Sequence, residues 1–163
     1  MMKQDAPRGR LSASPLHLLH RAGQCAELLF ASKVAEKDLT PRQFAVLATC
    51  ATEDDLSQTD IVRITGIDRS TLADIVRRLV QRGYLQRKRT RTDARRYAVR
   101  LTESGKSVLA QSEVTANSVD AEIVEALSAH DRQAFLTMLQ RVITDMEARV
   151  ARPDDDLEPG LED

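Results

Sequence analysis

Basic side chains are concentrated in one short part of the chain, and the chemistry they suit is the binding of a polyanion. The stretch RKRTRTDARRYAVRLT, residues 87–102, holds seven arginine or lysine residues and one acid. Residues 61–100 hold twelve lysine or arginine residues and three acids, although the whole chain of 163 residues has a formal net charge of −1. A concentrated positive segment in an otherwise acidic protein indicates a polyanionic partner. From charge alone, a solvated basic face is the alternative.

A helix is predicted directly before this stretch, and its polar face has the residue types that DNA recognition needs. Asp68 is a candidate N-cap and Gly83 a candidate C′ residue, so the helix runs to about Arg82. The apolar positions on one side are Leu72, Ile75, Val76, Leu79 and Val80, and the polar positions roughly opposite are Ser70, Asp74, Arg77, Arg78 and Gln81. A helix in the DNA major groove presents small polar groups and arginines to base edges and phosphates. An ordinary amphipathic surface helix is the alternative.

The neighbouring elements predict a winged helix-turn-helix around that helix. Ser57 with Asp60 forms a capping box that begins a shorter helix, and Gly66 ends it. Two short helices joined by a turn containing glycine form a helix-turn-helix. Further along, the apolar period changes to two, which predicts a hairpin with its turn at residues 91–94 and its second strand at residues 97–101. Such a basic hairpin would lie along a duplex as a wing, with arginines near the minor groove.

Long helices are predicted on both sides of this winged lobe. Apolar residues recur at helical spacing from about residue 15 to residue 36, in residues 104–127 and again after Ser128. Thr40 with Gln43 forms a capping box that begins a further helix before the lobe. The long helices carry more apolar surface than a small winged domain can bury alone, and such surface marks an interface.

The predicted fold is mainly α (α+β), a winged helix-turn-helix with a two-stranded wing and long terminal dimerisation helices. The predicted parts are a disordered lead over residues 1–14, an N-terminal dimerisation helix over 15–38, a DNA-binding lobe over 39–103, C-terminal dimerisation helices over 104–152, and an acidic disordered tail over 153–163.

One segment carries a resemblance to a known family. IVRITGIDRSTLADIVRRLVQRGYLQRKRTRTDARRYAVRLTESG resembles the winged helix-turn-helix of the MarR family of bacterial transcription regulators. The match rests on the glycine-terminated helix, the D-x-R pattern of Asp93 and Arg95, and the LTESG that closes the wing. Roughly residues 15–150 agree in arrangement. The resemblance implies an obligate homodimer with intertwined terminal helices, a pseudo-palindromic operator in double-stranded DNA, and repression.

The DNA contacts follow from this resemblance together with the charge pattern. Gln58 and Thr59 would touch the DNA backbone, and Arg95 would enter the minor groove, where Asp93 could hold it extended. Asp74 departs from the expected chemistry, because it could accept a hydrogen bond from a cytosine amino group or cost affinity beside phosphates. The full predicted set is Gln58, Thr59, Arg69, Ser70, Thr71, Asp74, Arg77, Arg78, Arg91, Asp93, Arg95 and Arg96.

The resemblance also implies a signal that releases DNA, either a small aromatic or phenolic ligand or the oxidation of a cysteine. The predicted effector-binding residues are His17, His20, Arg21, Cys25, Arg42 and Phe44. A buried arginine or histidine would suit a carboxylate or phenolate. Cys25 is the candidate redox sensor because Arg21 precedes it by one helical turn, whereas its place on the apolar stripe favours a buried thiol. Cys50 is predicted to be a core residue.

Other classes of protein lack support in the sequence. There is no recognisable catalytic triad, glycine-rich phosphate loop or metal-ligand spacing, so we expect neither an enzyme nor a bound metal or cofactor. Two cysteines do not make a disulfide framework, and no apolar run suits a membrane span or a signal peptide, which predicts a cytoplasmic protein without a membrane partner. A winged helix that docks proteins is the remaining alternative, and steeply salt-dependent binding would argue against it.

Overall fold

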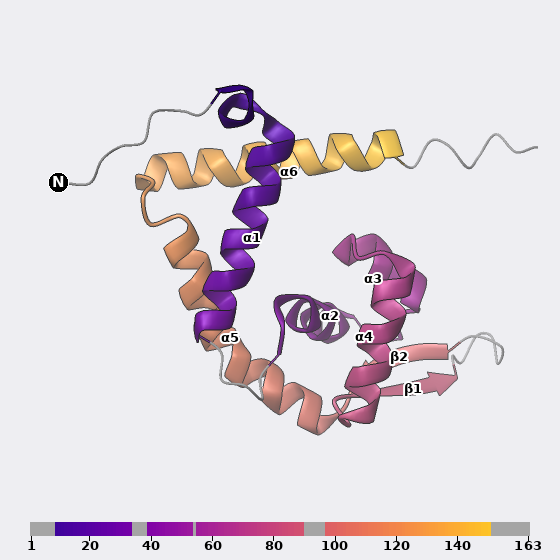
Figure 1. Ribbon diagram of the computed structural model, residues 1–163. Helices are drawn as coiled ribbons and strands as arrows, with labels where there is room; N and C mark the ends of the chain where they lie inside the picture. The colour runs from indigo at the N-terminus through magenta and orange to yellow at the C-terminus, as the bar shows by residue number, and fades with distance from the viewer. Residues whose placement is uncertain (1–8, 34–38, 54, 90–96, 151–163) are drawn as a thin grey trace, which may run out of the picture. The chain divides into compact units, whose positions relative to one another are not determined.

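The computed structural model describes residues 9–33, 39–53, 55–89 and 97–150, and the winged helix-turn-helix is visible in it (Figure 1). The elements, in chain order, are a 3-10 helix η1 (Gly9–Ala13), α1 (Pro15–Lys33), α2 (Pro41–Thr52), α3 (Gln58–Thr65), α4 (Arg69–Gln81), β1 (Leu85–Arg89), β2 (Tyr97–Leu101), α5 (Glu103–Ile123) and α6 (Ala129–Val150). The predicted class, mainly helical with a two-stranded wing, is confirmed. The described chain divides into two compact units at Asp120.

The helices of the lobe begin where the sequence predicts, because their N-caps satisfy backbone N–H groups that lack partners inside the helix. Thr40 Oγ1 accepts a hydrogen bond from the Gln43 N–H, and Gln43 Oε1 accepts one from the Thr40 N–H, both at 3.2 Å. Ser57 and Asp60 form the same reciprocal box at the start of α3. Asp68 caps α4 by accepting from the Thr71 N–H at 2.9 Å.

One hydrophobic core joins the helix-turn-helix to the wing. Gly66, at φ 67°, ends α3 in the left-handed region that glycine adopts without strain, and this allows the tight turn into α4. The inner face of α4 is buried, as predicted. The buried core residues are Leu39, Val46, Leu47, Cys50, Leu56, Ile61, Leu72, Ile75, Val76, Leu79, Leu85, Val99 and Leu109. The outer face of α4 is therefore held in a fixed position toward solvent.

The wing is an antiparallel hairpin, and it also contacts the segment before α3, which the sequence did not predict. Leu85 pairs with Leu101 across the two strands. Val99 N–H also donates to the Leu56 carbonyl at 2.9 Å, so a single-residue bridge attaches the wing to the segment before α3. Beside this bridge the Arg100 guanidinium forms a two-pronged ion pair with Asp55, its Nε lying 2.6 Å from Asp55 Oδ1. The wing is thus attached to the helix-turn-helix by backbone and side chains.

The LTESG segment fixes the start of α5 against the end of α4. Thr102 Oγ1 donates to the Gly83 carbonyl at 2.6 Å and accepts from the Gly105 N–H at 3.0 Å. Gly105 approaches so closely that a Cβ there would lie 2.1 Å from the Tyr84 carbonyl oxygen. Glycine is therefore required at this position because a side chain would not fit, and not because of its backbone angles.

The first residues and the helix ends differ in part from the prediction. Residues 9–13 were predicted to be disordered and instead form η1, in which Ser12 Oγ donates to the Gly9 carbonyl at 2.8 Å. Residues 1–8 and the acidic tail lie outside the described residues, as does the end that was predicted for α1. The helix predicted to reach about residue 127 ends at Ile123, and two short-range backbone hydrogen bonds, to the carbonyls of Glu122 and Val124, follow it.

The last helix, α6, forms most of the second compact unit. Ser128 Oγ accepts from the Asp131 N–H at 3.2 Å, which confirms the predicted cap, and Arg132 Nε donates to the Leu127 carbonyl at 2.9 Å. No residue of α6 is buried. Its large exposed apolar side chains are Phe135, Leu136, Met138, Val142, Ile143, Met146 and Val150. Across the described residues, no helix combines the length and apolarity that crossing a membrane would require.

Candidate functional site

The outer face of α4 presents polar side chains to solvent. Ser70, Arg77 and Arg78 are exposed, while Thr71 and Asp74 are partly buried. Near the start of the helix, Ser70 Oγ donates to Asp68 Oδ1 at 2.6 Å. This hydrogen bond and those from Thr71 hold the pKa of Asp68 well below its usual range, so the cap is ionised at neutral pH. The negative charge of this N-cap also interacts favourably with the positive end of the helix dipole.

Asp74 lies between the arginines of this face and pairs with both of them. One carboxylate oxygen accepts from Arg77, and the other lies 2.7 Å from Arg78 Nε. The hydrogen bond from Arg77 and the neighbouring positive charges lower the pKa of Asp74. Both arginine side chains remain more than half exposed, at 57% and 61%. The face therefore presents a compact Arg–Asp–Arg cluster rather than two independent cations.

The first turn of α3 contributes to the same side of the lobe. Gln58 and Thr59 line a small hollow of about 100 Å³ together with Arg69 from the first turn of α4. Val62 and Leu72 are its apolar lining residues. Three residues predicted to contact DNA are thus brought together by the helix-turn-helix, and the hollow contains amide, hydroxyl and guanidinium groups that can donate to a phosphate.

The wing adds positive charge beside α4, although less than the sequence count indicates. Arg87 and Lys88 on β1 are exposed. Arg100 belongs to the same basic stretch, but its ion pair with Asp55 directs it toward the segment before α3. Sequence reasoning missed this pair because its members are 45 residues apart. The predicted residues of the wing tip, Arg91, Asp93, Arg95 and Arg96, lie outside the described residues.

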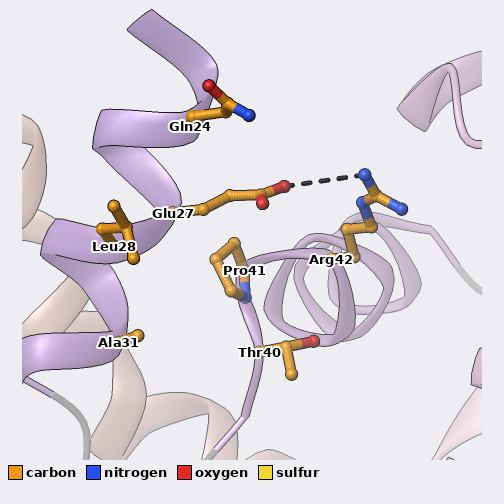
Figure 2. Close-up of a pocket in the computed structure, with 7 residues that line it drawn as sticks. All are labelled: Gln24, Glu27, Leu28, Ala31, Thr40, Pro41 and Arg42. Atoms are coloured by element: carbon orange, nitrogen blue, oxygen red, sulfur yellow. Dashed lines mark ion pairs between the residues drawn. The ribbon is translucent and has the colours of Figure 1, made fainter. Parts of the chain in front are cut away.

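A pocket of about 750 Å³ lies between α1 and the start of α2 (Figure 2). Glu27 and Arg42 face each other across it, with an oxygen and a nitrogen 3.6 Å apart, and both side chains are more than half exposed. The lining residues are Gln24, Glu27, Leu28, Ala31, Thr40, Pro41 and Arg42. Arg42 also lines a second pocket, of about 460 Å³, that reaches Gly66 and Asp68 at the turn before α4.

Of the predicted effector residues, only Arg42 lines the larger pocket. His17, His20 and Arg21 precede it on the same side of α1, one to two helical turns before Gln24 and Glu27. Phe44 instead packs into the core, with its ring centroid 6.4 Å from that of Phe30. Arg42 is the predicted residue that the structure places beside this cavity, where it faces Glu27.

The two cysteines are in different environments. Cys25 is exposed on α1, contrary to the buried position that its apolar neighbours favoured. Cys50 is buried in the core, as predicted, and desolvation raises the pKa of its thiol to about 11. Within the described residues, no cluster of three or more histidine, cysteine, aspartate or glutamate side chains could hold a metal ion.

Known proteins similar to this chain act on DNA. The MarR family profile matches residues 37–96. The HTH-type transcriptional repressor NicR of Pseudomonas putida is 31% identical over 127 residues, which span 78% of this chain and 80% of NicR.

Two solved structures share the fold. BpsR of Bordetella bronchiseptica, whose DNA binding is regulated by 6-hydroxynicotinic acid, is 28% identical with a TM-score of 0.72 over 77% of this chain and 96% of BpsR. The transcriptional repressor CouR, bound to a 23-mer DNA duplex, is 30% identical with a TM-score of 0.76 over 86% of this chain and 99% of CouR.

Proposed function

Because the chain belongs to the MarR family, a family of DNA-binding transcriptional regulators rather than enzymes, we propose that it is a homodimeric repressor of a pseudo-palindromic operator. In this proposal a small aromatic or phenolic ligand releases the operator. The observation that carries the proposal is the outer face of α4, which presents Ser70, Thr71, Arg77 and Arg78, and the neighbouring strand β1 adds the exposed Arg87 and Lys88. Hydroxyl and guanidinium groups on a fixed helix are the groups that read base edges and bind phosphates.

The apolar faces of the long helices support the homodimer. Leu16 on α1 is 81% exposed and Leu28 is 71% exposed, and α6 adds its own exposed apolar side chains. Large apolar side chains exposed along a helix are typical of an interface between subunits. A two-fold axis would place the two α4 helices about one DNA turn, roughly 34–36 Å, apart, which matches a pseudo-palindromic operator.

The pocket between α1 and α2 supports a small-molecule ligand. A guanidinium such as that of Arg42 binds a carboxylate through paired hydrogen bonds, and the pocket volume of about 750 Å³ lies within the usual range of small-molecule sites. The regulation of BpsR by 6-hydroxynicotinic acid supports the same ligand class. Glu27 would be the anion that the ligand carboxylate replaces at Arg42.

The DNA arm of the test is a titration of the purified protein, by fluorescence anisotropy, with promoter-region DNA of its own gene. A scrambled duplex of equal length is titrated in parallel, each at two salt concentrations. We expect tighter binding to the promoter DNA, and Arg77→Ala should weaken it by about 10- to 100-fold, the value of a good base contact. Arg141→Ala on α6 is the control, because it removes the same charge outside the winged lobe. DNA binding that depends neither on salt concentration nor on Arg77 would favour the protein-docking alternative.

The ligand arm adds aromatic acids, phenols and acyl-CoA thioesters to the preformed complex, and then peroxide. We expect an aromatic acid to release the DNA and Arg42→Ala to raise the concentration required. Release by peroxide that Cys25→Ser abolishes would instead support thiol sensing.

A further inference from the structure

Asp74 is the only acid between Arg69 and Arg82, in a helix face that would otherwise be wholly neutral or cationic. Its position is three residues before Arg77 and four before Arg78, so one helical turn brings all three side chains together. Each carboxylate oxygen serves a different arginine, with Oδ1 accepting from Arg77 and Oδ2 lying 2.7 Å from Arg78 Nε. The acceptor groups of Asp74 are therefore directed toward the two arginines on the outer face of α4.

This arrangement has different consequences for different DNA sequences. Sequence-independent binding depends on arginines that reach phosphates and release counterions. An arginine paired with Asp74 is already partly neutralised, and it must leave that carboxylate to follow the phosphates of an arbitrary duplex. By contrast, a base edge that meets the arginine in its restrained position loses little side-chain entropy on binding.

We propose that Asp74 is a specificity-determining residue, which holds Arg77 and Arg78 on the outer face of α4 and thereby limits their binding to DNA phosphates. The inference rests on the proposed DNA-binding function and goes beyond it. Asp74 acts through the arginines rather than on the DNA, and it is in this sense a positioning residue. Its removal should strengthen binding to every duplex while reducing the preference for the operator.

The first experiment compares wild type and Asp74→Asn, which keeps the size of the side chain and removes its charge. The probes are the promoter-region fragment and a scrambled duplex of equal length, titrated over a series of salt concentrations. We expect affinity for the scrambled duplex to rise about threefold to tenfold at low salt, and the slope of log K against log salt to steepen by about one, the increments of an added phosphate contact. Affinity for the promoter fragment should change less, so the ratio of the two affinities falls.

The matched control is Asp145→Asn, which makes the same substitution in an Asp–Arg pair on α6. Asp145 Oδ2 lies 2.9 Å from Arg149 Nε, and the pair is outside the winged lobe. This variant changes the net charge by the same amount, and it should leave both affinities unchanged. An equal rise in the control would mean that net charge alone explains the effect, and it would overturn the proposal.

A second comparison separates restraint of the arginines from simple repulsion between Asp74 and phosphate. Asp74→Asn is measured again with Arg77 and Arg78 both replaced by alanine. If Asp74 acts by restraining the arginines, the gain in affinity for the scrambled duplex should disappear in that background. The effects of the substitutions would then be non-additive. A gain of the same size would overturn the proposal in favour of repulsion, and a selective loss on the promoter fragment would overturn it in favour of a direct base contact by Asp74. Failure of the wild type to bind either duplex would instead refute the proposed DNA-binding function.

Discussion

The winged lobe and the last helix, α6, use their apolar side chains in opposite ways. In the lobe, Leu47, Leu72 and Leu79 are completely buried, and they come from two helices that meet in one core. In α6, seven large apolar side chains are exposed and no residue is buried. The lobe core therefore closes within a single chain, whereas α6 lacks a buried face within its own chain. In the proposed homodimer, the exposed apolar side chains of α6 would pack against a second copy of the chain.

This contrast bears on how the interface would operate. A fixed core holds the outer face of α4 and the wing in one arrangement, so the local reading of DNA belongs to each lobe. In the proposed homodimer, the spacing between the two lobes would be set by the association of the long helices. Under the same proposal, a ligand bound between α1 and α2 would change the spacing of the lobes, and so DNA binding, without contacting α4.

The largest expected effect is the loss of a core side chain in the lobe. Leu79→Ala removes a completely buried side chain of α4 that packs with α2, α3 and the wing. We expect the free energy of unfolding to fall by about 2–5 kcal/mol, the usual range for such a cavity. Urea unfolding followed by circular dichroism at fixed protein concentration would measure it. A loss below about 1 kcal/mol would mean that the lobe core is not as closed as its burial indicates.

Replacing an apolar side chain of α6 should instead affect the association of two subunits. Ile143→Asp places a charge where an exposed apolar residue now lies. Burying one isoleucine contributes roughly 1.5–3 kcal/mol, so its replacement by a charge should shift the protein from dimer toward monomer. Sedimentation velocity at several concentrations would detect the shift. An Arg141→Ala variant, changed at another exposed position of α6, should remain dimeric, and an unchanged dimer in Ile143→Asp would place the interface elsewhere.

Gly105→Ala tests the junction between the lobe and α5. The added Cβ would lie 2.1 Å from the Tyr84 carbonyl oxygen and 2.9 Å from a Leu101 methyl group, so the start of α5 must move. We expect a loss of about 1–3 kcal/mol in thermal or urea unfolding, as for other overpacked sites. Gly23→Ala on α1 is the control, because a Cβ there meets nothing within 4 Å. The control should be neutral or more stable by up to about 1 kcal/mol, since alanine favours a helix. Equal effects of the two would contradict the close approach at Gly105.

The sequence predicted the local features of the lobe because local interactions specify them. The caps at Thr40, Ser57 and Asp68 and the glycine at position 66 each satisfy or end a helix within a few residues. The amphipathic pattern of α4 was sufficient to assign its buried face. The predicted mainly helical winged fold could thus be inferred from periodicity, capping and the family resemblance.

The features that were missed depend on residues far apart in the chain. The Asp55–Arg100 pair and the Leu56–Val99 bridge join segments more than 40 residues apart, and no periodic pattern marks them. The close approach at Gly105 likewise needs the backbone of Tyr84 in place. Of the residues predicted to bind an effector, Arg42 lines the pocket between α1 and α2 and the α1 residues do not. The position of Arg42 opposite Glu27 depends on how α2 packs against α1, which no local pattern specifies.

The two cysteines give the clearest chemical contrast between the lobe and the long helices, and the expected contribution of Cys50 to stability is the smallest of these effects. Cys25 is exposed on α1, and Cys50 is buried in the lobe core, where desolvation raises the pKa of its thiol to about 11. At pH 8 only about one Cys50 side chain in a thousand is then a thiolate, the form that reacts. We expect iodoacetamide to label Cys25 in the native protein and Cys50 only after unfolding, as read by mass spectrometry.

Because the native state holds the Cys50 proton more tightly than the unfolded chain does, this thiol contributes constant stability below its ordinary pKa and less as pH rises toward 11. Native labelling of Cys50 at a rate similar to that of Cys25 would show that the lobe opens readily, and the contrast between a closed lobe and exposed helices would fail.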